Sequence, residues 1–383
     1  MIPKLVILTE IIAPYRIPVF NALARRPEID LQVIFLSEND PTRRQWRVYK
    51  DEISFTYEVL PSWRQRLGQY NVLINRGVHS ALNRAQPDIV LCGGYNYLAS
   101  WAVAHWARIH RVPLLLWSES TAFDLRRRYQ VVEFMKMRFL KMCSGFVVPG
   151  ASSLNYLKAL GIEEQLIFTA PNAVDTSLFS NLAEGVRRDE SLARSRHGLP
   201  PRYFLYVGRM VRAKGVFDLL DAYSQLEPDL RSKVGLVFVG DGTERRRLIE
   251  RASKITHGTI QFPGFVHRDQ LPEIYALADG LILPTYSDVW GLVANEAMAC
   301  NLPVIVTSVA GCALDLVENE WNGFVVPPRD PSRLAASMEN LAADSGRRQE
   351  MGCRSRQRID GYSPAAWAEG MVDAVQSVRA GMR

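Results

Sequence analysis

Short apolar runs alternate with amphipathic helical patterns along most of the chain. In the first half, the spacing predicts strands over residues 5–9, 31–37, 88–92, 114–118, 146–149 and 166–170. In the second half, it predicts strands over residues 203–207, 234–239, 259–262, 280–284, 303–307 and 323–326. Strands that alternate with helices are typical of βα units built around parallel sheets, so the predicted fold class is α/β.

Two polar stretches interrupt this alternation. Residues 38–66 are rich in Arg and Trp and are expected to run over the surface, and residues 180–201 have the composition of a linker. A chain of 383 residues is too long for one typical core. We therefore expect an N-terminal Rossmann-like domain over 1–175, a C-terminal Rossmann-like domain over 176–363, and a last helix over 364–383 that packs back on the first domain.

The composition excludes several protein classes. With 48% hydrophobic and 22% charged residues, the chain resembles an ordinary globular protein. It has no apolar run of bilayer length, and its start lacks the architecture of a signal peptide. The five cysteines show neither metal-type spacing nor a pairing rhythm, which favours a reducing compartment. We expect a cytoplasmic protein.

Positive charge is concentrated in the first half of the chain. Residues 1–175 contain 21 Lys and Arg against 15 Asp and Glu, whereas residues 176–383 contain 25 of each kind. Basic residues are mixed with apolar ones in three clusters, which are Arg43, Arg44, Trp46 and Arg47; Trp63, Arg64, Arg66 and Leu67; and Arg126, Arg127, Arg128, Phe134, Lys136, Met137, Arg138, Phe139, Leu140 and Lys141.

Such mixing suits an anionic membrane surface, so the protein could lie peripherally on the inner face of the membrane. The alternative is a core-facing helix with a solvated basic face. Nucleic acid is not expected as a partner, because no recognised binding motif accompanies the charge.

The run from Gly208 to Gly215 follows a predicted strand and precedes a predicted helix. Glycine at a strand exit lets the backbone turn and approach a ligand closely. Arg209 and Lys214 would then lie at the carboxyl end of the strand, where open α/β sheets bind ligands. Two cations there would stabilise the charge that a diphosphate gains as it leaves, in place of a metal. The chain has no Asp-x-Asp motif that could hold a divalent metal ion. The alternative is a solvated basic loop.

A second constellation runs from Asp288 to Pro303. It also follows a predicted strand, and residues 292–299 are predicted to form its helix. Asp288 lies in the loop and Glu296 lies more than one turn into the helix. Ionised carboxylates accept hydrogen bonds from adjacent sugar hydroxyls. The backbone N–H groups near Gly291 and Leu292 would form the helix N-terminus, which favours phosphate.

These motifs resemble those of glycosyltransferase family 4. The resemblance rests on Gly208-Arg209 with Lys214-Gly215, on Glu296 with the Ala297-Met298-Ala299 that follows it, and on the order of three shorter motifs. The shorter motifs are Pro171-Asn172-Ala173-Val174-Asp175, Val239-Gly240-Asp241-Gly242 and Phe262-Pro263-Gly264-Phe265. The similarity is specific over about residues 172–328 and weaker in the first half.

The resemblance implies a GT-B fold, with two Rossmann-like domains facing across a cleft, and a retaining glycosyltransferase without an essential metal or cofactor. Its donor would be a nucleoside-diphosphate sugar carrying a hexose-type sugar. Its acceptor would be a hydroxyl of a glycan or of a lipid-linked molecule in bacterial-type surface polysaccharide or glycoconjugate synthesis. By position, Arg209 and Lys214 would contact the diphosphate and Glu296 the ribose, and Asp288 would occupy the place of the sugar-contacting glutamate. The backbone of Gly264, Phe265 and Val266 would lie near the base, and Gly240 and Gly242 would border the cleft.

Three positions depart from the family pattern. Asp288 is one methylene shorter than the usual glutamate. Asn301 replaces a glycine, and we expect it to cap the preceding helix in the left-handed conformation. Glu119 stands at the end of a strand where many relatives have a histidine. It could assume the polar role beside the reacting carbon, or it could pair with a nearby arginine; the second reading is preferred.

Retention without an evident protein nucleophile favours front-face displacement. The other route forms a covalent intermediate on a carboxylate, for which Glu119 is the first candidate. Two competing functions share donor binding: a GT-B nucleotide-sugar epimerase and a non-catalytic nucleotide-sugar binding protein. A dinucleotide dehydrogenase is not expected, because no Gly-x-Gly-x-x-Gly follows the first strand.

Overall fold

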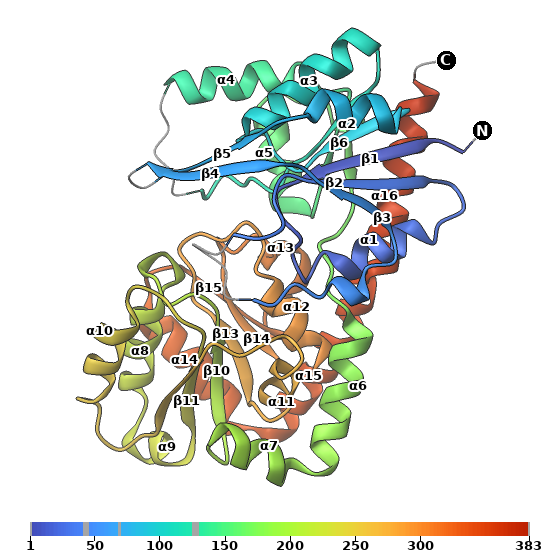
Figure 1. Cartoon of the computed structure of the whole chain (residues 1–383). Helices are drawn as coiled ribbons and strands as arrows, with labels where there is room; N and C mark the ends of the chain where they lie inside the picture. The colour runs from blue at the N-terminus through green and yellow to red at the C-terminus, as the bar shows by residue number, and fades with distance from the viewer. Residues whose placement is uncertain (1, 41–45, 68–69, 125–129, 382–383) are drawn as a thin grey trace. The chain divides into compact units, whose positions relative to one another are not determined.

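Two parallel β-sheets, one in each of two units, organise the chain (Figure 1). The computed structural model describes residues 2–40, 46–67, 70–124 and 130–381. Unit 1 comprises residues 1–120, 126–173 and 363–383, and unit 2 comprises residues 121–125 and 174–362. The predicted α/β class with parallel sheets is confirmed.

Unit 1 contains a seven-stranded parallel sheet in the order β3-β2-β1-β6-β7-β8-β9. Its strands are β1 Lys4–Thr9, β2 Asp30–Phe35, β3 Thr56–Val59, β6 Ile89–Cys92, β7 Leu114–Trp117, β8 Gly145–Val148 and β9 Ile167–Thr169. An antiparallel hairpin is formed by β4 Ser62–Leu67 and β5 Tyr70–Asn75. The helices are α1 Ile17–Ala24, α2 Val78–Ala85, α3 Leu98–His110, α4 Gln130–Leu140, α5 Ala151–Ala159 and α16 Pro364–Ala380.

Both faces of the unit 1 sheet are covered by helices, because successive strand residues point to opposite faces. Leu5 and Ile7 of β1 pack in one core with residues of α1 and α16. Val6 and Leu8 pack in the other core with residues of α2, α3 and α4. This two-sided burial explains why the strands consist of nearly continuous apolar runs.

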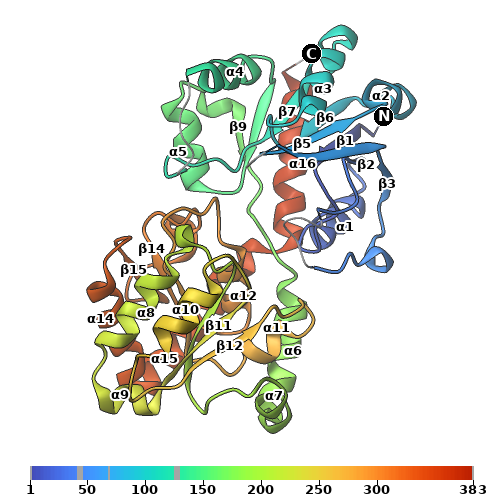
Figure 2. The ribbon, with the colours of Figure 1, turned by 60° about the vertical axis from the view of Figure 1, so that its left-hand side comes forward.

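Helix α16 lies at the end of the described chain and packs in unit 1 against α1 and β9 (Figure 2). The ring of Trp367 lies 5.7 Å from that of Phe20 and 5.2 Å from that of Trp117. A Cβ atom at Gly370 would lie 2.2 Å from the carbonyl oxygen of Thr169. The glycine therefore permits a close approach between the helix and the strand end.

Unit 2 contains a six-stranded parallel sheet in the order β12-β11-β10-β13-β14-β15. Its strands are β10 Tyr203–Val207, β11 Gly235–Val239, β12 Ile260–Gly264, β13 Gly280–Leu283, β14 Val304–Thr307 and β15 Gly323–Val326. Its helices are α6 Thr176–Arg188, α7 Glu190–His197, α8 Val216–Gln225, α9 Pro228–Lys233, α10 Arg245–Ala252, α11 Leu271–Tyr275, α12 Leu292–Ala299, α13 Ala313–Leu316, α14 Pro331–Ala343 and α15 Ser345–Ile359. The apolar side chains again separate into two cores, one on each face of the sheet.

Two predictions about irregular segments are wrong. Residues 38–66 were expected to be a surface excursion, but they include β3, which pairs in parallel with β2 and extends the sheet. Residues 180–201 were expected to be a linker, but α6 and α7 occupy most of them. The side chain of Asp175 accepts a hydrogen bond from the Leu178 N–H and caps α6, and Phe179 lies on the buried face of that helix. The polar composition concealed a helix with one apolar face.

Candidate functional site

The loops that leave the unit 2 strands at their carboxyl ends are hydrogen-bonded to one another. The Gly208 N–H donates to the Val239 carbonyl over 3.0 Å, and the Gly240 N–H donates to the Gly264 carbonyl over 2.8 Å. The Met210 N–H donates to the Asp241 carbonyl over 2.8 Å. Because β10, β11 and β12 are parallel neighbours, these bonds join their exits into one continuous edge. This edge bears the motifs that the sequence singled out.

Two glycines make this edge possible. Gly240 has a φ of 126°, and a Cβ atom there would lie 2.1 Å from the Gly208 carbonyl oxygen. Gly215 is the N-cap residue of α8 with a φ of 66°, and a Cβ atom there would lie 1.8 Å from the Pro284 carbonyl oxygen. Neither position accepts a side chain without moving the backbone. Gly242 is similarly restricted, since its Cβ atom would lie 2.4 Å from the Met210 carbonyl oxygen.

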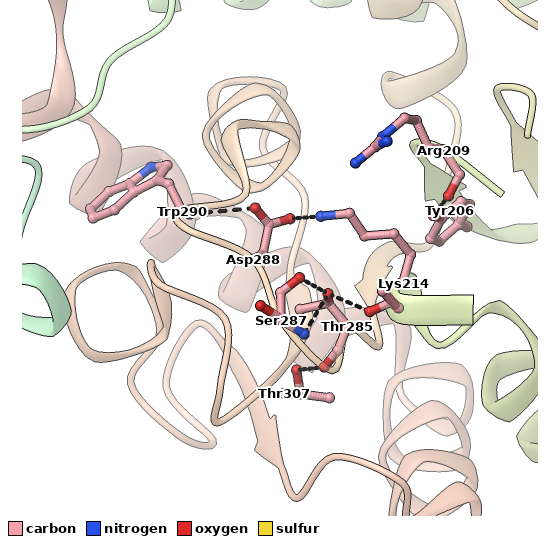
Figure 3. A network of polar contacts seen from close by, with 9 residues as sticks. Tyr206, Arg209, Lys214, Thr285, Ser287, Asp288, Trp290 and Thr307 are labelled. Carbon is pink, nitrogen blue, oxygen red and sulfur yellow. Dashed lines mark hydrogen bonds and ion pairs between the residues drawn. The ribbon is translucent and has the colours of Figure 1, made fainter. Parts of the chain in front are cut away.

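The ammonium group of Lys214 forms an ion pair with the carboxylate of Asp288 (Figure 3). The two side chains come from different loops, one between β10 and α8 and the other between β13 and α12. They are 17% and 16% exposed, so solvent screens the pair less than it would screen a surface pair. The structure thus brings together two residues that the sequence assigned to diphosphate and sugar.

Backbone and hydroxyl groups hold the loop that carries Asp288 in place. Thr285 Oγ1 donates to the Ser287 carbonyl over 2.8 Å, and Thr307 Oγ1 donates to the Thr285 carbonyl over 2.6 Å (Figure 3). The Tyr286 N–H donates to the Ala213 carbonyl over 2.9 Å, which connects this loop to the Lys214 loop. Thr285 follows β13 and Thr307 is the last residue of β14, but single hydroxyls at strand ends do not stand out in a sequence.

Arg209 lies beside this ion pair and is exposed. Its guanidinium makes no hydrogen bond or ion pair with the residues that the structure describes, whereas its carbonyl accepts a hydrogen bond from the Tyr206 hydroxyl over 2.8 Å. In Figure 3 the side chain extends on the same side of the loop as the Lys214 ammonium. The backbone is therefore fixed while the cationic group remains available.

Gly291 is the N-cap residue of helix α12 and has a φ of 101°. A Cβ atom at Gly291 would lie 3.9 Å from Asp288 Oδ2, so that carboxylate lies close to the start of α12, where negative charge is favoured. Leu292 is the first residue of the helix and is half-buried. At the other end, Asn301 adopts a φ of 58°, which confirms the left-handed conformation expected of it.

Glu296 lies within α12 and accepts a hydrogen bond of 2.7 Å from the hydroxyl of Tyr275. Burial raises the pKa of Glu296 to about 7, although the Tyr275 hydrogen bond and the charge of Arg268 oppose the shift. Near neutral pH this carboxyl group can be converted between its two forms by small changes in its surroundings. The sequence identified Glu296 but not its partner Tyr275, which lies at the end of α11 in an apolar pattern.

The segment expected near the base follows β12. Phe265 is 40% exposed, and its ring packs edge-on against His267 at 5.0 Å. Val266 is half-buried against the core of unit 2. An exposed aromatic ring beside the hydrogen-bonded edge formed by these loops can stack on a planar ligand.

Glu119 belongs to unit 1 and is held at the carboxyl ends of its strands. Its Oε1 lies 3.3 Å from Arg16 Nη2 and accepts a hydrogen bond of 3.2 Å from Asn172 Nδ2. The Arg16 guanidinium in turn lies 3.9 Å from the centre of the Trp117 ring. Burial opposes the charge on Arg16, but Glu119 and Tyr15 raise its pKa overall. The expected pairing with a nearby arginine is confirmed, in a half-buried setting rather than a solvated one.

The basic clusters of the first half are only partly surface features. Arg43, Arg44 and Arg126–Arg128 lie outside the described residues, as do the side chains of Arg66 and Leu67. Arg64 is half-buried in an ion pair of 2.8 Å with Asp40, and Lys136 is buried and paired with Glu133. The core also buries Phe139 and Leu140. Of the two alternatives for these clusters, the core-facing helix fits Phe139 and Leu140, and Arg64 and Lys136 are engaged by internal ion pairs rather than free for a membrane surface.

Two further features concern only the described residues. No group of three or more His, Cys, Asp or Glu side chains among them is arranged to hold a metal ion. None of the helices in this part of the chain combines the length and apolar character needed to cross a bilayer.

Comparison with known protein families gives two matches along the chain. Residues 20–178 match the family model described as Glycosyltransferase Family 4, and residues 187–358 match that of Glycosyl transferases group 1. Glycogen synthase of Mycobacterium tuberculosis is 29% identical over 283 residues, covering 72% of this chain and 64% of the relative. D-inositol 3-phosphate glycosyltransferase of Salinispora arenicola is 30% identical over 211 residues, covering 52% of this chain and 47% of the relative. The matched region thus spans less than two thirds of these relatives' lengths.

Solved structures share the fold over nearly the whole chain. Anabaena HepE in complex with UDP has a TM-score of 0.76 at 19% identity, covering 98% of this chain and all of that one. Sucrose-phosphate synthase from Thermosynechococcus elongatus has a TM-score of 0.76 at 20% identity, covering 99% of this chain and 100% of that one. The fold is that of the GT-B glycosyltransferases. The two family matches together span both units, and the chain belongs to the group 1 glycosyltransferases of family 4.

Proposed function

We propose that this glycosyltransferase is a retaining, metal-independent enzyme that uses a nucleoside-diphosphate sugar. It transfers a hexose-type sugar to a hydroxyl of a glycan or lipid-linked acceptor, in the cytoplasm or at the inner face of the membrane. Synthesis of bacterial-type cell-surface polysaccharide or glycoconjugate is the process that we assign to it. The observation that carries the proposal is the Lys214–Asp288 ion pair beside the available guanidinium of Arg209.

The ion pair is suited to exchange partners when the donor binds. A diphosphate oxygen replaces the Asp288 carboxylate at Lys214, while donor sugar hydroxyls donate hydrogen bonds to the released carboxylate. Arg209 supplies a second cation at low reorganisation cost, since its backbone is already fixed by Tyr206. As the glycosidic bond breaks, both cations stabilise the negative charge that develops on the leaving diphosphate.

The chemical step is a front-face displacement. The acceptor oxygen forms a bond to the anomeric carbon on the face from which the diphosphate departs, and the bond between that carbon and the phosphate oxygen breaks. The acceptor proton passes to a phosphate oxygen of the leaving nucleoside diphosphate. No metal ion and no protein nucleophile takes part in this scheme.

Glu119 serves on the acceptor side as a carboxylate that Arg16 and Asn172 hold in one orientation. One of its oxygens is engaged by both partners, which leaves the other to accept a hydrogen bond from an acceptor hydroxyl. An engaged carboxylate of this kind is a weaker candidate for a covalent nucleophile than an unpaired one.

The first donor to test is UDP-glucose, because solved structures of Anabaena HepE contain UDP and UDP-glucose. Thermal-shift measurements with UDP, GDP and ADP select the nucleotide, and release of free nucleoside diphosphate from the matching sugar donor then reports transfer. Lack of any shift and of any release with all three nucleotide classes would overturn the proposed function.

Replacing either Arg209 or Lys214 is expected to remove most of the turnover. In Arg209→Ala and in Lys214→Ala, nucleoside diphosphate release should fall by about a hundredfold or more, because stabilisation of the leaving group is lost. Arg212→Ala is the matched control from the same loop, since this side chain is 67% exposed and pairs with Glu244. Equal losses in all three variants, or retained activity in the first two, would contradict the assignment.

Replacing Asp288 is expected to separate nucleotide binding from turnover. In Asp288→Ala the Lys214 ammonium loses its competing partner, so UDP should bind about two- to fivefold more tightly, which corresponds to a weak ion pair. Turnover of the sugar donor should fall, because the hydroxyl acceptor is gone. Calorimetric titration with UDP measures the first effect; weaker UDP binding would show that Asp288 does not compete for Lys214.

Nucleotide binding is expected to release a proton from Glu296. In the free protein the carboxyl group is partly protonated near its pKa of about 7, and ribose hydroxyls that donate to it favour the ionised form. Affinity should therefore rise with pH between about 6 and 8 and be lost as the pH falls through the pKa.

Titration in two buffers of different ionisation enthalpy counts the released protons. Glu296→Gln is the matched control, because the nucleotide's own protonation is identical with both proteins. An equal proton release in this variant would rule out Glu296 as its source.

Replacing Glu119 is expected to reduce turnover without stopping it. Glu119→Gln keeps a hydrogen-bond acceptor, so turnover should fall by about tenfold, with the change mainly in the acceptor KM. A covalent glycosyl-enzyme trapped at Glu119 in mass spectra of the wild-type protein, together with complete loss of turnover in the variant, would favour the double-displacement route.

A further inference from the structure

Helix α4 of unit 1 carries large apolar side chains on two different sides. Its inner side contributes Phe139 and Leu140 to the core. Its outer side exposes Val131 by 73%, Phe134 by 64% and Met135 by 40%. Exposed Arg138 continues the same spacing of i, i+3, i+4 and i+7, which defines a single stripe along a helix. We call Val131, Phe134, Met135 and Arg138 the outer stripe.

The outer stripe is unusual for a solvent-facing surface. Single exposed apolar residues are common, but here three lie within five positions, and Val132 beside them is 53% exposed. Phe139 anchors the helix, since its ring lies 5.2 Å from that of Trp101 on α3. Figures 1 and 2 both show α4 at the periphery of unit 1. A fixed helix therefore presents an uncovered apolar stripe.

Four exposed cations lie at the carboxyl ends of α3 and α4. The only acidic residue of α4, Glu133, is paired with Lys136. Lys141 directly follows the helix and shares a surface hollow with Arg108 and Arg111 of the α3 end. Arg138, Lys141, Arg108 and Arg111 are all exposed, and none forms an ion pair with a described residue. An apolar stripe with uncompensated cations matches a lipid surface with anionic headgroups.

We propose that the outer stripe of α4 inserts into the interface of an anionic bilayer, with these four cations contacting the headgroups. This inference assigns a contact surface to the membrane location proposed above and does not depend on the transferase chemistry. It also moves the membrane contact away from Arg64 and Lys136, which the structure engages in internal ion pairs. An amphipathic helix of this kind lies in the membrane plane with its apolar side chains about 5–10 Å deep.

Co-sedimentation with phospholipid vesicles tests the inference on the full chain. The wild-type protein should bind vesicles of phosphatidylcholine with about one third phosphatidylglycerol and should not bind pure phosphatidylcholine. Raising the salt from about 0.1 to 1 M shortens the Debye length from roughly 10 to 3 Å and should release the protein. Absence of binding to the anionic vesicles would overturn the inference.

Two matched pairs of variants locate the contact. Phe134→Ser with Met135→Ser should bind at least about tenfold more weakly, because the inserted apolar area is lost. Leu192→Ser with Leu314→Ser is the control, since these leucines of unit 2 are 62% and 65% exposed. Arg138→Glu with Lys141→Glu should abolish binding, whereas Arg246→Glu with Arg247→Glu on α10 should retain it. Equal binding within either pair would refute the location.

Two further measurements keep the outcomes separate. Thermal midpoints and the nucleotide-induced thermal shift should be unchanged in all four variants, so a loss of vesicle binding reports neither unfolding nor loss of the proposed function. Sedimentation velocity tests the other occupant of an apolar stripe, a second copy of the chain. A dimer that only the Phe134 and Met135 variant dissociates would show that the stripe is a protein interface and would refute the lipid contact.

Discussion

The ion pair between Lys214 and Asp288 joins two loops that follow the neighbouring strands β10 and β13. It exists because both strands are parallel and deliver their carboxyl ends to one edge of the sheet. The surrounding backbone leaves little freedom, since Gly215 touches Pro284 and Thr285 is fixed by Thr307. A cation and an anion held this rigidly are preorganised, because folding has already oriented their charges and little reorganisation is needed when a ligand binds.

Most of the fold could be predicted from the sequence because its signals are local. A strand covered by helices on both faces must be apolar throughout, and runs such as those of β10 and β13 stand out for that reason. The failures have the opposite cause. The edge strand β3 is half exposed and therefore lacks a continuous apolar run. Helix α6 is polar on most of its surface and shows its nature only through Asp175, Phe179 and Ala183.

The candidate residues of unit 2 were identifiable because they occur in motifs at fixed spacing. The side chains that contact these candidate residues could not be identified from the sequence. No pattern in the sequence pairs Tyr275 with Glu296 or Arg16 with Glu119, since these contacts depend on how separate loops and helices converge in space. The same holds for charge. The sequence counts Arg64 and Lys136 as surface cations, but three-dimensional packing pairs Arg64 with the distant Asp40 and buries Lys136 beside its helix neighbour Glu133.

The position of α16 has a consequence for how the protein is made. Trp367 on this helix completes the aromatic cluster with Phe20 and Trp117, yet the ribosome adds it only after all of unit 2 has been synthesised. Until α16 has been synthesised, the N-terminal part of unit 1 therefore has part of its apolar face uncovered, whereas all residues of unit 2 are already available for folding. Vectorial folding from first domain to last, which is common in multidomain proteins, is reversed in its final step here. Premature termination just before Pro364 would leave an intact second unit attached to an incomplete first one.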